Sequence, residues 1–330
     1  MSVGLTKSRF TNALKCYWNY ALSRFGLVRI SHAPLFVSVE PAAVCQLKCP
    51  ACPVGLRDAG VPKNRNTGRL MSLDTWHRVL SEIRETAFVV QFYFQGEPLL
   101  NKDLPQMIKE AHDAGLYTIV STNAQALTQQ MAEDLVAAGL NRIIISMDGL
   151  TEDSYGAYRI GGSLEKTKAA LLFLRKAKDK HQTPYTIHPT PIIELQCLRL
   201  RTNEHEWTDF KRQYKALGAD RLVFKTAQLY NYSNGHPLMV SELRYSRYTK
   251  GADGLYHRKP RSKKCFRIWS GAVVTTTGEV LPCCYDKAHQ YSYGNIMDTP
   301  LKELFANAQS MAFRRAALRE QPAICQECWR

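Results

Sequence analysis

The sequence lacks any long uninterrupted apolar segment. No run of 18 apolar residues occurs in its 330 residues, although a membrane-spanning helix needs about that length. Residues 1–34 also lack the compact apolar stretch and the small-residue cleavage site of a signal peptide. We therefore expect a cytoplasmic protein without a transmembrane segment.

Two further absences narrow the class of protein. The chain has no internal repeat of useful length and no low-complexity tract, which argues against a solenoid and against a disordered protein. Residues 1–39 contain no acidic residue, although they carry five Lys/Arg. With 45% hydrophobic residues, the chain can bury one large core, alone or with an appendage.

Ten cysteines are present, and their spacing is informative. They include two tight groups and two isolated residues: Cys45, Cys49 and Cys52; Cys325 and Cys328; and Cys16 and Cys197. In a reducing compartment, clustered cysteines more often hold metal or perform redox chemistry than form disulfides. The grouping therefore predicts metal or redox sites.

The net charge of +15 predicts attraction to anionic partners without specifying a function. Residues 257–264 hold five Lys/Arg and would contact phosphate or form a solvated loop. In residues 1–34, apolar side chains recur at near-helical spacing between basic ones: Phe10, Leu14, Trp18, Leu22 and Phe25. This pattern suits contact with an anionic membrane surface, or packing of a helix on its own domain.

Between Leu35 and about Thr226, short β-branched or aromatic runs alternate with segments of helical period. This alternation predicts repeated βα units around a parallel sheet. The expected strands are Phe36–Glu40, Phe88–Phe94, Leu116–Ser121, Arg142–Met147, Thr186–Cys197 and Arg221–Lys225. Six units are too few for a closed eight-stranded barrel, so we expect a partial barrel or an open sheet, with ligands at the carboxyl ends of the strands.

Helix ends are predicted by capping residues. Ser72, Asp103 and Thr128 each precede a segment of helical period, and Gly115 and Gly139 follow two of those segments. After about Lys225 the pattern changes to a hairpin-like stretch over 272–281 and one final helix over 301–319. We therefore predict a basic N-terminal segment (1–34), a βα domain (35–226) and a small α+β domain (227–330).

Three cysteines follow the first predicted strand directly, in the segment Cys45-Gln-Leu-Lys-Cys49-Pro-Ala-Cys52. A cubane cluster has four irons and is usually held by Cys thiolates, so three cysteines leave one iron open for a small molecule. A zinc site or a chance clustering of buried cysteines is the alternative.

This spacing resembles the hallmark of the radical S-adenosylmethionine (SAM) superfamily. The resemblance implies a partial (β/α)6 barrel in which the open iron binds the amino and carboxylate groups of SAM. It further implies that an electron from a reductase, flavodoxin or ferredoxin cleaves SAM, and that a 5′-deoxyadenosyl radical abstracts hydrogen from the substrate.

Further motifs of the family follow at successive strand ends. They are Gly96-Glu97-Pro98, Ser121-Thr122-Asn123, Ser146-Met147-Asp148-Gly149 and Arg159 within Tyr158-Arg159-Ile160-Gly161-Gly162. The resemblance implies these roles: Gly96 and Glu97 hold the SAM ammonium, Ser121 and Asn123 face SAM, Ser146 bonds the ribose, and Arg159 pairs with the SAM carboxylate. Each motif is also ordinary turn and cap chemistry at a βα junction. The residue before the third cysteine, commonly aromatic in the family, is Ala51.

The C-terminal cysteines resemble a SPASM/twitch extension, which carries auxiliary iron-sulfur clusters. The resemblance implies one auxiliary 4Fe-4S cluster with four ligands: Cys265, Cys283, Cys325 and Cys328. The central cysteine group of the full pattern is missing, so we expect one auxiliary cluster. Cys284 is an alternative to Cys283, and a structural zinc site with four cysteines is an alternative to the cluster.

The substrate is the least determined feature. The resemblance implies hydrogen abstraction from a sugar-like or peptide substrate. Cys197 is a candidate hydrogen donor to a substrate radical or, alternatively, a small buried hydrophobe. Glu194 and Gln196 lie on the opposite strand face from Leu195 and Cys197. The competing interpretation is a non-catalytic, basic zinc protein that contacts nucleic acid, which leaves the strand-end motifs unexplained, so no nucleic acid is expected.

Overall fold

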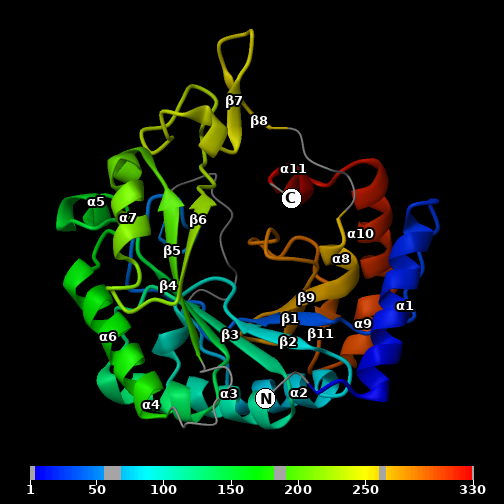
Figure 1. The fold of residues 1–330 in the computed structure, drawn as a ribbon. Helices are drawn as coiled ribbons and strands as arrows, with labels where there is room; N and C mark the ends of the chain where they lie inside the picture. Colours follow the sequence, from blue (N-terminus) through cyan, green and yellow to red (C-terminus); the bar gives the residue numbers. More distant parts are fainter. Residues whose placement is uncertain (1–3, 56–67, 182–190, 260–264, 329–330) are drawn as a thin grey trace. The chain divides into compact units, whose positions relative to one another are not determined.

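The computed structural model describes residues 4–55, 68–181, 191–259 and 265–328 (Figure 1). The chain forms two compact units. Unit 1 comprises Met1–Val44, Pro62–Ile119 and Arg261–Arg330, and unit 2 comprises Cys45–Val61 and Val120–Pro260. These units do not follow the boundaries expected at residues 35 and 227, and the three-part organisation stays a prediction.

Unit 1 contains a mixed sheet. Its strands are β1 (Phe36–Val39), β2 (Val89–Phe92), β9 (Gly271–Val274), β10 (Glu279–Leu281) and β11 (Gly294–Asn295). Strand β1 pairs in parallel with both β2 and β9, whereas β10 pairs antiparallel with β9 and β11. The predicted C-terminal hairpin is therefore confirmed, and it extends the sheet that β1 begins. All four residues of β9 are buried, which explains its apolar sequence.

Side-chain caps begin some of the helices of unit 1, and others lack them. Its helices are α1 (Lys7–Ser23), α2 (Leu73–Ile83), η1 (Pro98–Leu100), α3 (Leu104–Asp113), α8 (Arg267–Ser270), α9 (Leu301–Ala306), α10 (Ala308–Arg319) and α11 (Ala323–Gln326). The Ser72 side chain accepts from the Thr75 amide, as predicted for the start of α2. Asp103 occupies the N-cap position of α3, but within the described residues its side chain makes no cap hydrogen bond.

The single helix predicted over 301–319 is wrong, because Asn307 interrupts it. Asn307 has extended backbone angles, with φ −72° and ψ 176°, and ends α9. Its side chain then accepts from the Ser310 amide and caps α10. Asparagine competes with the helical backbone for hydrogen bonds, which favours a cap over a helix interior.

Unit 2 contains parallel strands alternating with helices. Its elements are β4 (Arg142–Ser146), β5 (Ile192–Arg199) and β6 (Arg221–Thr226), with α4 (Gln129–Ala137), α5 (Glu152–Gly156), α6 (Leu164–Lys180), η2 (Arg201–Glu206), α7 (Trp207–Gln213), η3 (Leu243–Tyr245), β7 (Tyr248–Lys250) and β8 (Tyr256–Arg258). Strand β3 (Tyr117–Thr122) passes from unit 1 into unit 2. Strands β4, β5 and β6 pair in parallel, and β7 with β8 forms a separate hairpin.

All six predicted strands of the βα region are present. Strand β5 ends at Arg199, two residues beyond the predicted end, because its pairing with β6 continues to Arg199 and Thr226. The predicted start of this strand, and the basic residues 260–264, lie outside the described residues. None of the helices built from the described residues combines the length and hydropathy that a transmembrane span requires.

Candidate functional site

In the cysteine loop of unit 2, two N–H groups donate hydrogen bonds to the sulfur of Cys45. The Leu47 amide and the Asn123 side-chain amide both donate to Cys45 Sγ, each over 3.4 Å. The Cys52 amide donates to the Cys49 carbonyl over 3.1 Å, which closes a turn between these two cysteines. Two N–H donors on one sulfur suit a negatively charged, metal-bound thiolate.

Cys49 is the most buried of the three cysteines in the loop. It is 5% exposed, and a Cβ on Gly55 would lie 2.7 Å from the Cys49 nitrogen, so the chain closes tightly around it. Burial raises the pKa of the Cys49 thiol, nearby Cys52 and Asp148 raise it further, and Arg159 lowers it. A buried thiol of this kind ionises when a cation or a metal compensates its charge.

Arg159 provides such a cation. Its Nε donates to Asp148 Oδ2 over 2.6 Å, and its Nη1 lies 3.9 Å from Cys49 Sγ. Burial lowers the pKa of Arg159, but Asp148 and Cys49 together raise it above its ordinary value, so the guanidinium stays charged. Sequence reasoning assigned a role to Arg159 but missed Asp148. The available signal was an acidic residue two positions after Ser146, at the end of a predicted strand.

The other predicted cofactor residues of unit 2 lie at strand ends. Asn123 follows β3, and its Oδ1 accepts from Gln46 over 3.2 Å while its amide reaches Cys45. Ser146 is the last residue of β4 and is 7% exposed, and Ser121 is half-buried within β3. The structure therefore brings Asn123 and Arg159 to the cysteine loop, whereas the SAM contacts of all four residues stay predictions.

The Gly96-Glu97 motif belongs to unit 1. Gly96 has φ +71°, and a Cβ there would lie 2.2 Å from the Ala42 carbonyl oxygen, so only glycine fits. The Glu97 amide donates to the Val44 carbonyl over 2.8 Å, and its carboxylate accepts from the Leu99 amide over 3.1 Å. The motif thus anchors the segment before the cysteine loop and caps η1, and its SAM contact stays a prediction.

A second group of cysteines lies within unit 1. Cys265 and Cys283 both line a cavity of about 400 Å³, together with Ser38 of β1 and Gln91 of β2. Burial raises the pKa of Cys283, and the charges of Cys284, Cys265 and Cys328 raise it further. Cys325 is 5% exposed, and its carbonyl accepts from the Cys328 amide over 3.2 Å.

A guanidinium accompanies this group as well. Burial lowers the pKa of Arg267, but Cys284, Tyr93 and Cys283 raise it above the ordinary value. A cation here offsets the negative charge of several thiolates, which suits a cluster held entirely by cysteines. Among the described residues, no three Cys, His, Asp or Glu side chains are spaced to ligate a single ion, so all seven ligand assignments stay predictions.

Cys197 has the environment of a buried structural residue. It is fully buried on β5, and its sulfur accepts from Asn203 Nδ2 over 3.6 Å. Burial raises the pKa of the thiol, as do Asp148 and Glu206. These surroundings favour the small-hydrophobe alternative, and hydrogen donation by Cys197 stays a prediction. Glu194, on the other face of β5, is buried in an ion pair with Arg142.

Known protein families match both regions of the chain that contain the grouped cysteines. Residues 39–192 match the radical SAM superfamily, and residues 265–329 match the SPASM iron-sulfur cluster-binding domain. The PqqA peptide cyclase of Bradyrhizobium diazoefficiens is 29% identical over 76% of this chain and 66% of its own length. The AdoMet-dependent heme synthase of Methanosarcina barkeri is 25% identical over 92% of this chain and 89% of its own.

Solved structures share the fold. SuiB of Streptococcus suis, bound to its precursor peptide SuiA, matches with a TM-score of 0.65 and 13% identity, over 93% of this chain and 71% of SuiB. The same protein bound to S-adenosylmethionine matches with a TM-score of 0.66. This likeness confirms the predicted α/β fold with a parallel sheet, as in partial-barrel proteins.

Proposed function

The chain belongs to the radical SAM superfamily and is an enzyme with a SPASM iron-sulfur domain, and from this premise we propose that it modifies a peptide. Its cofactors are SAM, a SAM-binding 4Fe-4S cluster and an auxiliary iron-sulfur cluster. The observation that carries the proposed site is the arrangement of Asn123 and Arg159 around the cysteine loop.

We assign the cluster ligands to two sets of cysteines. Cys45, Cys49 and Cys52 hold the SAM-binding cluster, whereas Cys265, Cys283, Cys325 and Cys328 hold the auxiliary cluster. When bound, the first cluster supplies the electron that cleaves SAM, and a reductase, flavodoxin or ferredoxin supplies that electron in turn. The donors on Cys45 and the cation near Cys49 support this assignment, because both favour thiolates over thiols.

The protein's own polar residues position SAM. We assign Gly96 and Glu97 to the SAM ammonium, Ser121, Asn123 and Ser146 to its polar edges, and Arg159 to its carboxylate. Asp148 fixes the Arg159 guanidinium from Nε, and Nη1 lies near Cys49 Sγ, which leaves Nη2 for the carboxylate. A guanidinium is well suited to this task, because it stays charged and its N–H groups form charge-assisted hydrogen bonds with a carboxylate.

A peptide substrate is favoured over a sugar-like one by the relatives. One is named a PqqA peptide cyclase, and SuiB was crystallised with its precursor peptide. The chain spans about two thirds (66%) of the length of the first of these relatives, so its own reaction and substrate are proposals.

The first experiment measures iron, sulfide and zinc in anaerobically purified protein and in a variant with Cys45, Cys49 and Cys52 all changed to Ala. We expect about eight irons in the parent and about four in the variant. Only the parent should then form deoxyadenosine from SAM with dithionite. Zinc without iron, and no deoxyadenosine after reconstitution, would support the zinc-protein alternative instead.

The substrate class is tested separately, with the parent enzyme and SAM. Short peptides encoded beside the gene are incubated in one arm, and monosaccharides in the other. A mass change in a peptide, with deoxyadenosine formed in proportion, is the expected result. Turnover of a sugar alone would reject the peptide proposal while leaving the SAM chemistry intact.

A further inference from the structure

Helix α1 of unit 1 turns its polar side chains inward. The buried residues recur every three or four positions along one side: Arg9, Asn12, Cys16, Asn19 and Ser23. The large apolar side chains exposed on the helix are Phe10, Leu14, Tyr17 and Trp18. Since residues three and four apart share a helix face, this is the reverse of an ordinary surface helix.

Arg9 anchors the beginning of this inward face. Its guanidinium donates to four carbonyl groups, those of Gly4, Arg84, Ala114 and Gly115, over 2.6 to 3.0 Å. Arg84 and Ala114 are the C-cap residues of α2 and α3. Helix C-termini present unpaired carbonyls and partial negative charge, which a buried cation stabilises.

Amide side chains anchor the rest of the helix. Asn12 accepts from the Ala33 amide over 2.9 Å and donates to its carbonyl over 3.1 Å. Asn19 donates to His32 Nδ1 over 2.9 Å, and the other ring nitrogen of His32 bonds the Trp269 carbonyl over 2.8 Å. These directional bonds fix which side of α1 faces the protein. The expected packing of this helix on its own unit is therefore present, but through its polar side.

The outward side combines apolar and basic residues. Phe10 is 50% exposed, Trp18 is 65% exposed, and Phe25, just after the helix, is 84% exposed. Lys7 and Lys15 are exposed on the same helix, and residues 1–39 contain no acidic residue. Large apolar side chains beside lysines on one helix are typical of helices that lie in the interface of an anionic membrane.

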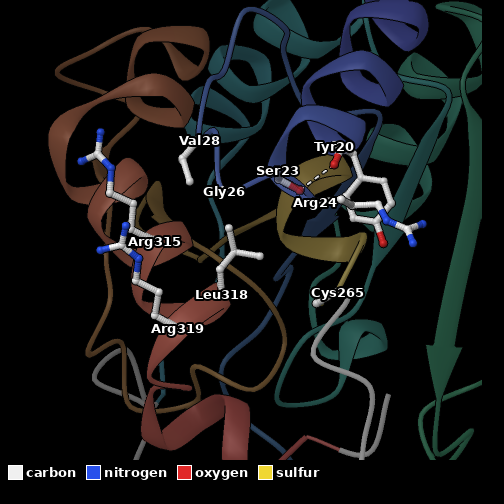
Figure 2. A pocket seen from close by; sticks show the side chains of 9 residues that line it. All are labelled: Tyr20, Ser23, Arg24, Gly26, Val28, Cys265, Arg315, Leu318 and Arg319. Carbon is white, nitrogen blue, oxygen red and sulfur yellow. Dashed lines mark hydrogen bonds between the residues drawn. The ribbon is translucent and has the colours of Figure 1, made fainter.

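A basic pocket adjoins the end of α1 (Figure 2). It has a volume of about 390 Å³ and is lined by Tyr20 and Arg24 on one side, by Arg315 and Arg319 of α10 on another, and by Cys265, which the proposal above assigns to the auxiliary cluster. Its described lining contains no acidic residue. Within the described part of the chain, none of the three arginines has a carboxylate partner. The guanidinium groups of Arg24 and of Arg315 and Arg319 point outward on opposite sides of the pocket (Figure 2), so they do not converge on one anion. Ser23, which belongs to the buried side of α1, also lines the pocket, so the pocket carries no part of the inference below.

We propose that the outward side of α1 docks on an anionic lipid surface. Phe10, Leu14 and Trp18 enter the interfacial region, and the exposed Lys7 and Lys15 reach the lipid phosphates. A second copy of the chain is a poorer occupant. Pairing two α1 faces would bring like charges from both copies together without any acidic partner in residues 1–39.

The test is flotation with vesicles made of phosphatidylcholine and phosphatidylglycerol in equal parts, beside vesicles of phosphatidylcholine alone. The full-length parent should bind the anionic vesicles far more strongly. A Phe10→Ser/Leu14→Ser/Trp18→Ser variant should lose this binding. A Lys7→Gln/Lys15→Gln variant should bind about twenty-five-fold more weakly, since each basic residue near an anionic surface contributes roughly five-fold.

Matched control variants change exposed residues elsewhere. Leu172→Ser/Leu255→Ser/Met297→Ser removes three exposed apolar side chains, and Lys211→Gln/Lys215→Gln removes two exposed lysines; both should bind like the parent. Circular dichroism checks that every variant is folded. The proposal is overturned if the parent does not bind anionic vesicles, or if the α1 variants bind as well as their controls. If the parent binds no vesicles but forms a dimer, and the Phe10→Ser/Leu14→Ser/Trp18→Ser variant is a monomer, α1 is an interface between two copies of the chain instead.

Discussion

Arg159 donates from Nε to Asp148 Oδ2 over 2.6 Å, and the Asp148 side chain is fully buried. Asp148 also accepts from the Leu198 amide over 2.6 Å, which ties the end of β4 to β5. The pair therefore connects a strand end to the cation near Cys49. Removing one member of a buried ion pair leaves the other charge uncompensated, which typically lowers the free energy of unfolding by about 3 to 5 kcal/mol.

This pair supports a prediction that separates stability from SAM binding. Arg159→Gln should lower the free energy of unfolding by about 3 kcal/mol, because Asp148 remains charged and buried. It should also raise KM for SAM, because the proposed partner of the SAM carboxylate is lost. Adding Asp148→Asn should recover most of the stability without recovering KM. Urea unfolding and deoxyadenosine formation measure the two effects, and an unchanged KM in both variants would contradict the assigned role.

A second prediction concerns the adjacent cysteines of the auxiliary site. Cys283 lines the cavity that Cys265 also lines, whereas Cys284 is not part of that lining. Cys283→Ser should therefore lower the iron content from about eight to about four atoms per chain, while Cys284→Ser should keep about eight. Iron analysis and electron paramagnetic resonance of the reduced proteins measure this. The reverse pattern would make Cys284 the ligand.

Local sequence signals predicted the six strands of the βα region and the capped ends of α2, α3 and α4. Long-range contacts decided much of what they missed. β-branched runs and caps such as Ser72 act over a few residues, so the sequence displays them directly. The inverted orientation of α1 depends on Arg9 reaching carbonyls of residues 84 and 114, which no local pattern reveals. The apolar periodicity of residues 10–25 alone gives no sign of which side faces the protein.

The candidate site could likewise be predicted where a local motif marks a residue, and not where only the folded contacts do. The cysteine spacing and the strand-end motifs identified Asn123 and Arg159, both of which lie beside the cysteine loop. Asp148 was missed because its importance comes from burial and from its bonds to Arg159 and Leu198, which appear only after folding. The interruption of the last helix at Asn307 was missed because the surrounding residues favour a helix on both sides.

A third prediction concerns Gly96. An alanine there would adopt φ near +71° and place its Cβ 2.2 Å from the Ala42 carbonyl oxygen. We expect Gly96→Ala to lower the free energy of unfolding by about 2 to 5 kcal/mol, from backbone strain and overpacking together. Gly254→Ala is the control, because Gly254 has φ +80° with nothing within 4 Å of its Cβ position. Equal shifts in Tm for the two variants would show that the Ala42 contact is unimportant.

The last prediction follows from His32, which links α1 to Trp269. Burial lowers the pKa of His32 to about 4, and the positive charge of Arg314 opposes protonation as well, although the hydrogen bond to Trp269 partly offsets both. The unfolded chain, with a His pKa of about 6.5, therefore binds more protons than the folded chain between these values. Stability should fall as the pH drops through this window, and His32 alone should account for about 2 kcal/mol between pH 7 and pH 5.

Substitution of His32 isolates this contribution from other titrating groups. The difference in unfolding free energy between pH 7 and pH 5 is measured by urea unfolding for the parent, for His32→Asn and for His77→Asn, whose side chain is 51% exposed. His32→Asn should reduce that difference by about 2 kcal/mol, because an amide does not take up a proton in this range. His77→Asn should leave it close to the parent value. If His32→Asn retains the full pH dependence, another buried group must titrate in its place.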